Sequence, residues 1–142
     1  MRIYVPVKNC KIGQNVIWHH EELINLYGCT IGYNTKIGTF VEIGNDVIIG
    51  HDCRIQSFVF IPPGIEIGDY VFIGPHVCFT NMKLPKPGVD QRDCLLKTKV
   101  GNGVMIGANA TILPGLTIGD NAVIGAGVTV TKSVAFGETV IT

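Results

Sequence analysis

Charged residues are scarce in this 142-residue sequence, and the two signs balance. Asp, Glu, Lys and Arg make up only 15% of the chain, and the formal net charge at pH 7 is +0. Because no basic excess is present, we expect no nucleic-acid partner. Hydrophobic residues reach 46%, which excludes an intrinsically disordered chain. The length suits one domain, and we predict a single domain over residues 1–142.

Long apolar runs are missing as well. No stretch of about 18 uncharged apolar residues occurs, so no membrane span is expected. The opening residues, MRIYVPVKNCKIG, lack the apolar run of a signal peptide. We therefore expect a cytoplasmic protein.

Cysteine is present but shows no paired spacing. The number of cysteines is odd, and none forms a C-x-x-C motif: Cys10, Cys29, Cys53, Cys78 and Cys94. Neither a disulfide framework nor a zinc site is expected from this pattern. We interpret the cysteines as small buried residues and expect no bound metal.

What the sequence does contain is a repeat with a period of six residues. A large apolar residue opens each unit, a glycine often follows it, and the fifth position is usually small or β-branched. The opening residues are Ile31, Ile37, Ile43, Ile49, Ile55, Ile61, Ile67, Ile73 and Phe79, then Val100, Ile106, Ile112, Ile118, Ile124 and Val130. A period of six fits neither a helix nor plain strand alternation. It predicts short strands joined by sharp turns, three units to a triangular coil, with the coils stacked in parallel.

The repeat also assigns a place to each residue of a unit. The large first residue and the small fifth residue are both expected to point into the narrow interior. We expect the glycines to supply turn dihedrals that a side chain would disfavour. Asn and Asp in the same turns, such as Asn34 and Asn121, tolerate those dihedrals too. The predicted fold class is all-β, a parallel β-helix.

Two segments interrupt the repeat. Residues 18–28, WHHEELINLYG, shift the register by one residue, and we expect a local bulge or a short helical turn there. Residues 80–99 carry Pro85, Pro87 and Gly88 and many polar side chains, so they predict a loop extruded from a coil. A loop on a rigid repeat scaffold is a usual carrier of function. Within it, Lys83 and Arg92 are candidate substrate-binding residues that could face a pyrophosphate.

Three runs carry a family resemblance: CTIGYNTKIGTFVEIG, VFIGPHVCFTN and MIGANATILPGLTIGDNAVIGAGVTVTKSV. They resemble the hexapeptide-repeat, left-handed β-helix N-acetyltransferases that act on nucleotide-linked amino sugars. These include enzymes acetylating 3-amino-3,6-dideoxyhexoses on dTDP and 3-amino uronates on UDP. The resemblance implies a left-handed coil, acetyl-CoA as the acyl donor, and a homotrimer with its sites between subunits. It also implies that the acceptor is a nucleotide-linked amino sugar.

The resemblance also implies roles for individual residues. Asn81 matches an Asn that orients the acceptor amine, and Lys132 matches a Lys near the CoA phosphates. Turns in the later coils would contact the pantetheine arm: Gly107 and Ala108, then Ala126 and Gly127. Departures from the family pattern leave the sugar open. Met82 replaces an Asp, Leu84 replaces the Tyr of a Tyr-Pro pair, and the sequence ends at GETVIT without the usual Gly-Asn-Pro.

The chemistry of the loop favours an amine acceptor. A hydroxyl acceptor needs a general base, and residues 80–99 contain no histidine. An amine is partly neutral near pH 7 and attacks a thioester if it is oriented and if the oxyanion is stabilised. Backbone N–H groups of the Gly107–Ala108 turn are expected to provide that stabilisation. His76 is a second catalytic candidate. Two alternatives stay open: O-acetyl transfer with His76 as the base, and a non-catalytic scaffold.

Overall fold

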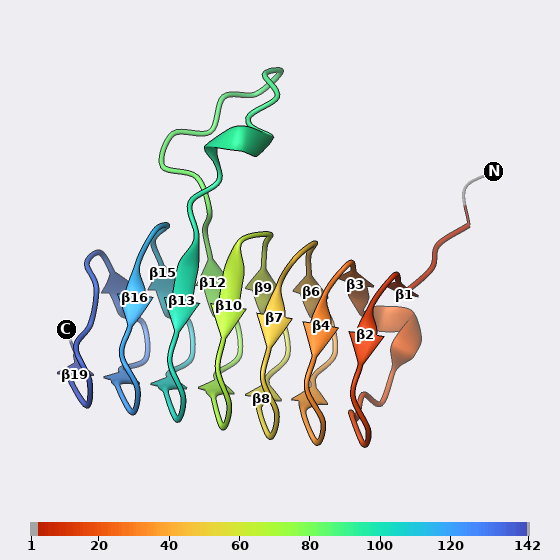
Figure 1. Ribbon diagram of the computed structural model, residues 1–142, viewed down its shortest axis with the longest axis horizontal. Helices are drawn as coiled ribbons and strands as arrows, with labels where there is room; N and C mark the ends of the chain where they lie inside the picture. Colours follow the sequence, from red (N-terminus) through yellow and green to blue (C-terminus); the bar gives the residue numbers. More distant parts are fainter. Residues whose placement is uncertain (1–2, 142) are drawn as a thin grey trace.

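The computed structural model describes residues 3–141, which wind into a left-handed parallel β-helix (Figure 1). The chain runs down the front of the prism, crosses below, rises at the back and advances steadily from the N-terminal to the C-terminal end. That path is a left-handed coil, so the predicted fold class is confirmed. Within these residues no helix is long and apolar enough to cross a membrane.

Three parallel sheets form the sides of the prism. Sheet A contains β1 (Val7–Lys8), β3 (Asn25–Tyr27), β6 (Glu42–Ile43), β9 (Phe60–Ile61), β12 (Cys78–Phe79), β15 (Thr111–Ile112) and β18 (Thr129–Val130). Sheet B contains β2 (Lys11–Ile12), β4 (Thr30–Ile31), β7 (Ile48–Ile49), β10 (Ile65–Ile67), β13 (Thr98–Val100) and β16 (Thr117–Ile118). Sheet C contains β5 (Lys36–Ile37), β8 (Arg54–Ile55), β11 (Phe72–Ile73), β14 (Met105–Ile106), β17 (Val123–Ile124) and β19 (Thr139–Val140). We call the turns between them corner AB, corner BC and corner CA, in chain order.

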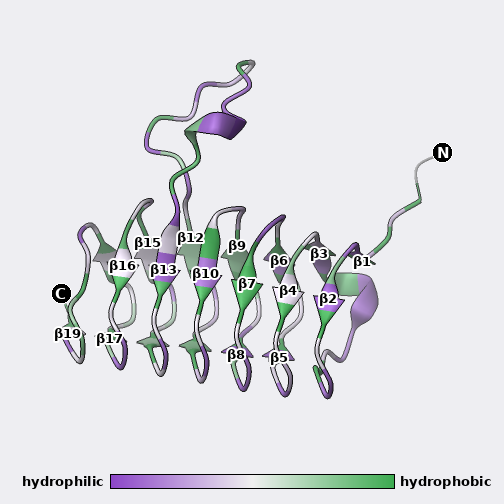
Figure 2. Ribbon diagram, in the orientation of Figure 1, coloured by the Kyte–Doolittle hydropathy of each residue, from purple (hydrophilic) through white to green (hydrophobic). Residues whose placement is uncertain are grey.

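The repeat residues form the core, as expected. Ile31 pairs with Ile49, and Ile49 pairs with Ile67, so equivalent residues stack on successive coils. All fifteen opening residues of the units are at most 3% exposed, and the small fifth residues are buried beside them. Figure 2 shows the hydrophobic strand residues recurring along the prism. Each buried Ile contributes about 1.5–3 kcal/mol, and every coil depends on its neighbours for that burial.

The glycines act differently from the expectation. The glycines that follow the large residues do not have a left-handed backbone. Residues two positions later have it instead, such as Asn34 (φ 58°), Phe58 (φ 66°) and Asn121 (φ 59°). Those glycines are required because the coils approach closely. A Cβ on Gly32 would lie 2.5 Å from the carbonyl carbon of Gly50 in the next coil. The expectation of a dihedral role was therefore wrong, and the physical reason is backbone contact between coils.

Both interruptions lie where the sequence places them. Residues 18–28 contain a short 3-10 helix, η1 (Glu21–Leu23), and Ile12 pairs with Ile31, one residue beyond the usual register. The second interruption leaves sheet A after β12 and returns at β13. It carries η2 (Arg92–Cys94) and stands out from the prism (Figure 1). The extruded loop is confirmed.

Candidate active site

The extruded loop leaves the prism at corner AB, where the neighbouring coils make tight turns. Gly64 and Gly115 hold left-handed backbone at this corner, with φ of 95° and 80°. Asn81 ties the base of the loop to this turn, because its Nδ2 donates to the Pro63 carbonyl at 2.9 Å. The Leu96 N–H donates to the Asn81 carbonyl at 2.8 Å, which closes the loop. The Asn81 side chain therefore has a fixed place at the mouth of the loop.

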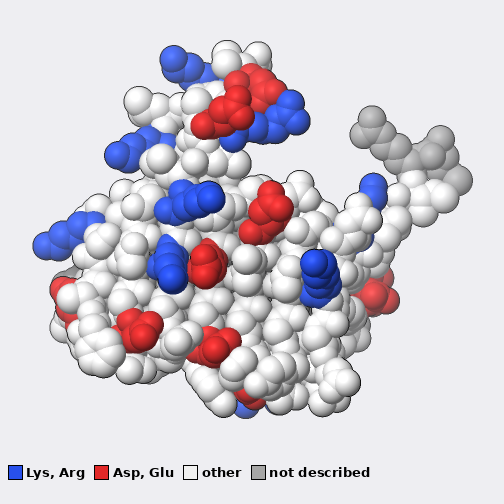
Figure 3. Space-filling model, viewed as in Figure 1, with Lys and Arg blue, Asp and Glu red and all other residues white. Residues whose placement is uncertain are grey.

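Two cavities flank the loop. The larger, about 690 Å³, lies between the loop and the outer face of sheet B, and its charged lining comprises Asp46, Glu66, Arg92, Lys97 and Lys99. Figure 3 shows charged side chains of both signs on the loop and on the face below it. The smaller, about 560 Å³, lies on the C-terminal side against the turn at Pro114.

The two predicted substrate-binding residues line different cavities. Arg92 lines the larger cavity and Lys83 the smaller one. Arg92 is already paired within the loop, since its Nη2 donates to Asp90 Oδ2 at 2.6 Å and its Nε donates to Oδ1 at 3.0 Å. The guanidinium lowers the pKa of the Asp90 carboxyl through these hydrogen bonds. Lys97 and Lys99 are the other cations of the larger cavity, and neither was predicted as a substrate-binding residue.

His76 lies at corner CA, on the opposite edge of sheet A from Asn81, because β12 runs between them. Its ring stacks on Phe58 with centroids 4.7 Å apart, and Phe58 stacks on Phe40 at 4.9 Å. The two Phe side chains are about half exposed and hold left-handed backbone, a conformation that bulky residues rarely adopt. This aromatic ladder was not predicted, although the 18-residue spacing of its members could have revealed it.

The predicted CoA-binding residues also divide between two corners. Gly107, Ala108, Ala126 and Gly127 lie at corner CA, on the coils that follow His76. Lys132 follows β18 and therefore lies at corner AB, on the side of the loop. Within one chain, the predicted residues are thus brought together as two groups on opposite edges of sheet A.

One backbone group expected to stabilise the oxyanion is not available. The Gly107 N–H donates to the Ile124 carbonyl at 2.8 Å, because this bond holds the two coils together. The expectation for Gly107 as an oxyanion donor was therefore wrong. The Ala108 N–H makes no backbone hydrogen bond within residues 3–141 and keeps its donor free.

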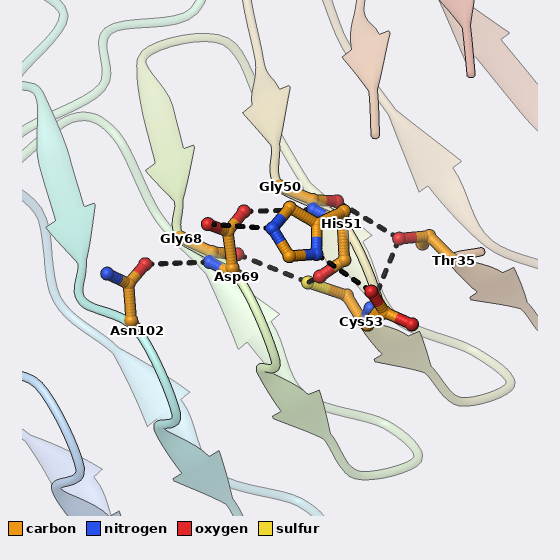
Figure 4. Close-up of polar contacts among 8 residues, drawn as sticks. Thr35, Gly50, His51, Cys53, Gly68, Asp69 and Asn102 are labelled. Carbon is orange, nitrogen blue, oxygen red and sulfur yellow. Dashed lines mark hydrogen bonds and ion pairs between the residues drawn. The ribbon is translucent and has the colours of Figure 1, made fainter. Parts of the chain in front are cut away.

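His51 anchors a separate polar cluster at corner BC (Figure 4). Its Nδ1 lies 2.8 Å from Asp52 Oδ2 and its Nε2 lies 3.2 Å from Asp69 Oδ2, while its ring stacks on Tyr33 at 4.5 Å. Asp69 Oδ1 also accepts from the His51 N–H at 3.0 Å. Because both ring nitrogens face carboxylates, we assign His51 to holding the coils together. The described chain contains no group of three or more side chains arranged to hold a metal.

The fold and the extruded loop define a hexapeptide-repeat transferase scaffold. The chain belongs to the bacterial transferase hexapeptide family, whose sequence profile (described as "Bacterial transferase hexapeptide (six repeats)") matches residues 28–62, 46–81 and 97–132.

Solved structures with the same fold include several acyltransferases. A mutant of AntD, an N-acyltransferase from Bacillus cereus, was crystallised with dTDP-4-amino-4,6-dideoxyglucose and coenzyme A. It is 24% identical, covers 88% of this chain and 74% of its own, and superposes with a TM-score of 0.74. The acetyltransferase domain of PglB from Neisseria gonorrhoeae is 14% identical over 92% of this chain and 50% of its own, with a TM-score of 0.65. Serine acetyltransferase isoform 3 from Entamoeba histolytica is 26% identical over 87% of this chain and 36% of its own, with a TM-score of 0.52.

Proposed function

We propose that this protein transfers an acetyl group from acetyl-CoA to the amino group of a nucleotide-linked amino sugar. The observation that carries the proposal is the loop at corner AB, which holds Asn81 at its base and covers a charged cavity on sheet B. The AntD complex, with its amino sugar and coenzyme A, offers a precedent on the same fold.

The proposed reaction uses direct attack by the acceptor amine. The amine nitrogen forms a bond to the thioester carbonyl carbon, the carbon–sulfur bond breaks, and the amine loses a proton as the CoA thiolate leaves. Asn81 would orient the amine through its side-chain oxygen, since its Nδ2 is bonded to Pro63. The free Ala108 N–H would stabilise charge on the carbonyl oxygen. His76, which is exposed and makes no side-chain hydrogen bond within residues 3–141, could accept the proton.

A site built from both groups of residues requires two subunits. In one chain Asn81 and Ala108 lie on opposite edges of sheet A. A homotrimer in which corner AB of one subunit meets corner CA of the next would place them on the two sides of one cleft. Such a contact is head-to-tail and closes into a ring at threefold rotation. The exposed stack of Phe40 and Phe58 gives corner CA an apolar surface for this contact.

The trimer makes a direct prediction for Phe58. Phe58→Asp puts a charge into the proposed interface, so we expect the protein to sediment as a monomer and to lose most of its activity. Aspartate tolerates the left-handed backbone at this position (φ 66°), so the fold should persist, which circular dichroism can check. Tyr70→Asp is the matched control, because Tyr70 is also exposed and left-handed (φ 56°) but lies at corner BC. A Phe58→Asp variant that stays trimeric would contradict this interface.

The larger cavity suits the polar groups of the proposed acceptor. Lys97 and Lys99 offer charge to a diphosphate, while Asp46 and Glu66 offer acceptors to hydroxyl or ammonium groups. The exposed Ile48 side chain supplies an apolar wall. We therefore propose that the nucleotide diphosphate binds in this cavity.

The cavity assignment predicts the effect of a single lysine. Lys99→Ala should weaken binding of dTDP or UDP by about tenfold or more, since a hydrogen bond to a charged group contributes about 1.5–3 kcal/mol. Isothermal titration calorimetry with dTDP, UDP and pyrophosphate measures this directly. Lys36→Ala, on the outer face of sheet C, is the control and should bind as wild type. Equal affinity in the two variants would place the diphosphate elsewhere.

One assay tests the proposed activity as a whole. Release of the CoA thiol is followed with acetyl-CoA and a panel of dTDP- and UDP-linked amino sugars, together with their hydroxyl counterparts. We expect release only with an amino sugar. Release only with hydroxyl sugars, abolished by His76→Ala, would establish O-acetyl transfer instead. No release with any acceptor would favour a scaffold role and contradict the proposal.

A further inference from the structure

Two cysteines meet at the first coil of the prism. Cys10 immediately precedes β2 and Cys29 immediately precedes β4, the adjacent strand of sheet B. Their sulfur atoms lie 3.4 Å apart. The Lys11 N–H donates to the Cys29 carbonyl at 2.9 Å, which fixes the two strands side by side. Among residues 3–141, no other pair of cysteine side chains makes a hydrogen-bonding contact.

This geometry needs little change to form a disulfide. Neighbouring strands lie about 4.8 Å apart, within the range of Cα separations that a disulfide spans. Rotation of the side chains can bring the sulfurs to bonding distance without moving the backbone. We propose that Cys10 and Cys29 are a redox-active dithiol whose disulfide staples the first coil of the prism to the second. This proposal is independent of the proposed function.

The surroundings assign different roles to the two thiols. Cys10 is partly exposed at the end of the stack, so it is the thiol that an oxidant reaches. Cys29 is 1% exposed, and its burial, together with the contact with Cys10, raises the pKa of its thiol to about 12. Cys29 is therefore protonated at neutral pH and reacts second.

The reaction balances with a low-molecular-weight disulfide as oxidant. The Cys10 thiolate attacks glutathione disulfide, its sulfur–sulfur bond breaks, and one glutathione thiolate leaves. Cys29 loses its proton and attacks the Cys10 sulfur of the mixed disulfide, which releases the second glutathione. Two protein thiols are oxidised by two electrons, and two glutathione thiols are formed. Because the thiolate is the nucleophile, the second step should accelerate as pH rises toward the pKa of Cys29.

The test uses the full chain with Cys94→Ser, which removes the exposed thiol of the loop. The protein is equilibrated with glutathione redox buffers and digested with trypsin after alkylation. We expect a linked pair of peptides, Asn9–Lys11 joined to Ile12–Lys36, and faster formation at pH 9 than at pH 7. The oxidised protein should melt about 5 °C or more above the reduced protein, because a disulfide restricts the unfolded chain.

Cys10→Val is the matched variant, since valine suits an inward position and cannot be oxidised. Its melting temperature should be the same in oxidising and reducing buffer. If the linked peptides do not form at excess glutathione disulfide, or if Cys10 links to another cysteine, the proposal is overturned. Equal melting temperatures for the oxidised and reduced parent would overturn the stapling role.

Discussion

Replacing Asn81 with alanine is expected to lower kcat for acetyl transfer by about 100-fold. The side chain lies at the mouth of the loop, where its Nδ2 donates a hydrogen bond to the Pro63 carbonyl at 2.9 Å, and in the proposed mechanism its oxygen orients the acceptor amine. A misplaced acceptor amine loses the near-attack geometry, and displacements of about 1 Å cost rates of this order. Steady-state rates with saturating acetyl-CoA and amino sugar measure the effect.

Thr80→Val is the control that distinguishes orientation of the acceptor amine by Asn81 from anchoring of the loop. Thr80 Oγ1 donates to the Ile112 carbonyl at 2.9 Å, so its loss loosens the base of the loop without touching the amine contact. We expect this variant to keep most of its kcat. An equal loss in both variants would mean that Asn81 only anchors the loop. An unchanged rate in Asn81→Ala would remove Asn81 from the mechanism.

Gly107→Ala is expected to lower the free energy of unfolding by about 2–3 kcal/mol, the upper range for overpacking a close contact. The added Cβ would lie 2.5 Å from the Ala126 nitrogen, so the backbone of one coil must move. That movement stretches the bond from the Gly107 N–H to the Ile124 carbonyl and loosens the stack on both sides. Thermal or urea unfolding followed by circular dichroism measures the loss.

Gly127→Ala provides the comparison at the same corner. Nothing lies within 4 Å of its added Cβ, but its backbone is left-handed at φ 72°. The cost is therefore only that of the dihedral, about 1–2 kcal/mol. If Gly127→Ala proved the more damaging change, clearance between coils would not be the main reason for glycine at the second position of the repeat.

The interior of the prism could be derived from spacing alone. The burial of residues such as Ile49 and Val47 follows from the six-residue period alone. A coil of three units then determines which residues stack on one another. The placement of Asn81 and Gly107 on opposite edges of sheet A was not predicted, because the loop interrupts the count between them. The role of Gly107 could not be derived, because a repeat shows where glycine recurs but not whether a dihedral or a neighbouring coil demands it.

The sequence predicted where the loop lies but not which contacts its residues make. Its Pro and Gly residues end the repeat, yet they do not determine that Arg92 pairs with Asp90 or that Lys97 and Lys99 line a cavity. The Arg92–Asp90 pair depends on the local path of the loop, and the cavity joins loop residues to strands from other coils, so both depend on the folded chain. The left-handed backbone of Phe58 was equally hidden, because bulky residues usually avoid it.

The loop leaves the stacking of the prism unchanged on either side. Ile67 of β10 pairs with Val100 of β13 in the same inward register that joins Ile49 to Ile67. A segment that leaves and re-enters the prism at one corner can be lengthened, shortened or exchanged without changing the strand register of any coil. Under the proposed function, loop replacement would change acceptor specificity and leave the donor side intact. Grafting this loop onto a related prism would then transfer its acceptor preference.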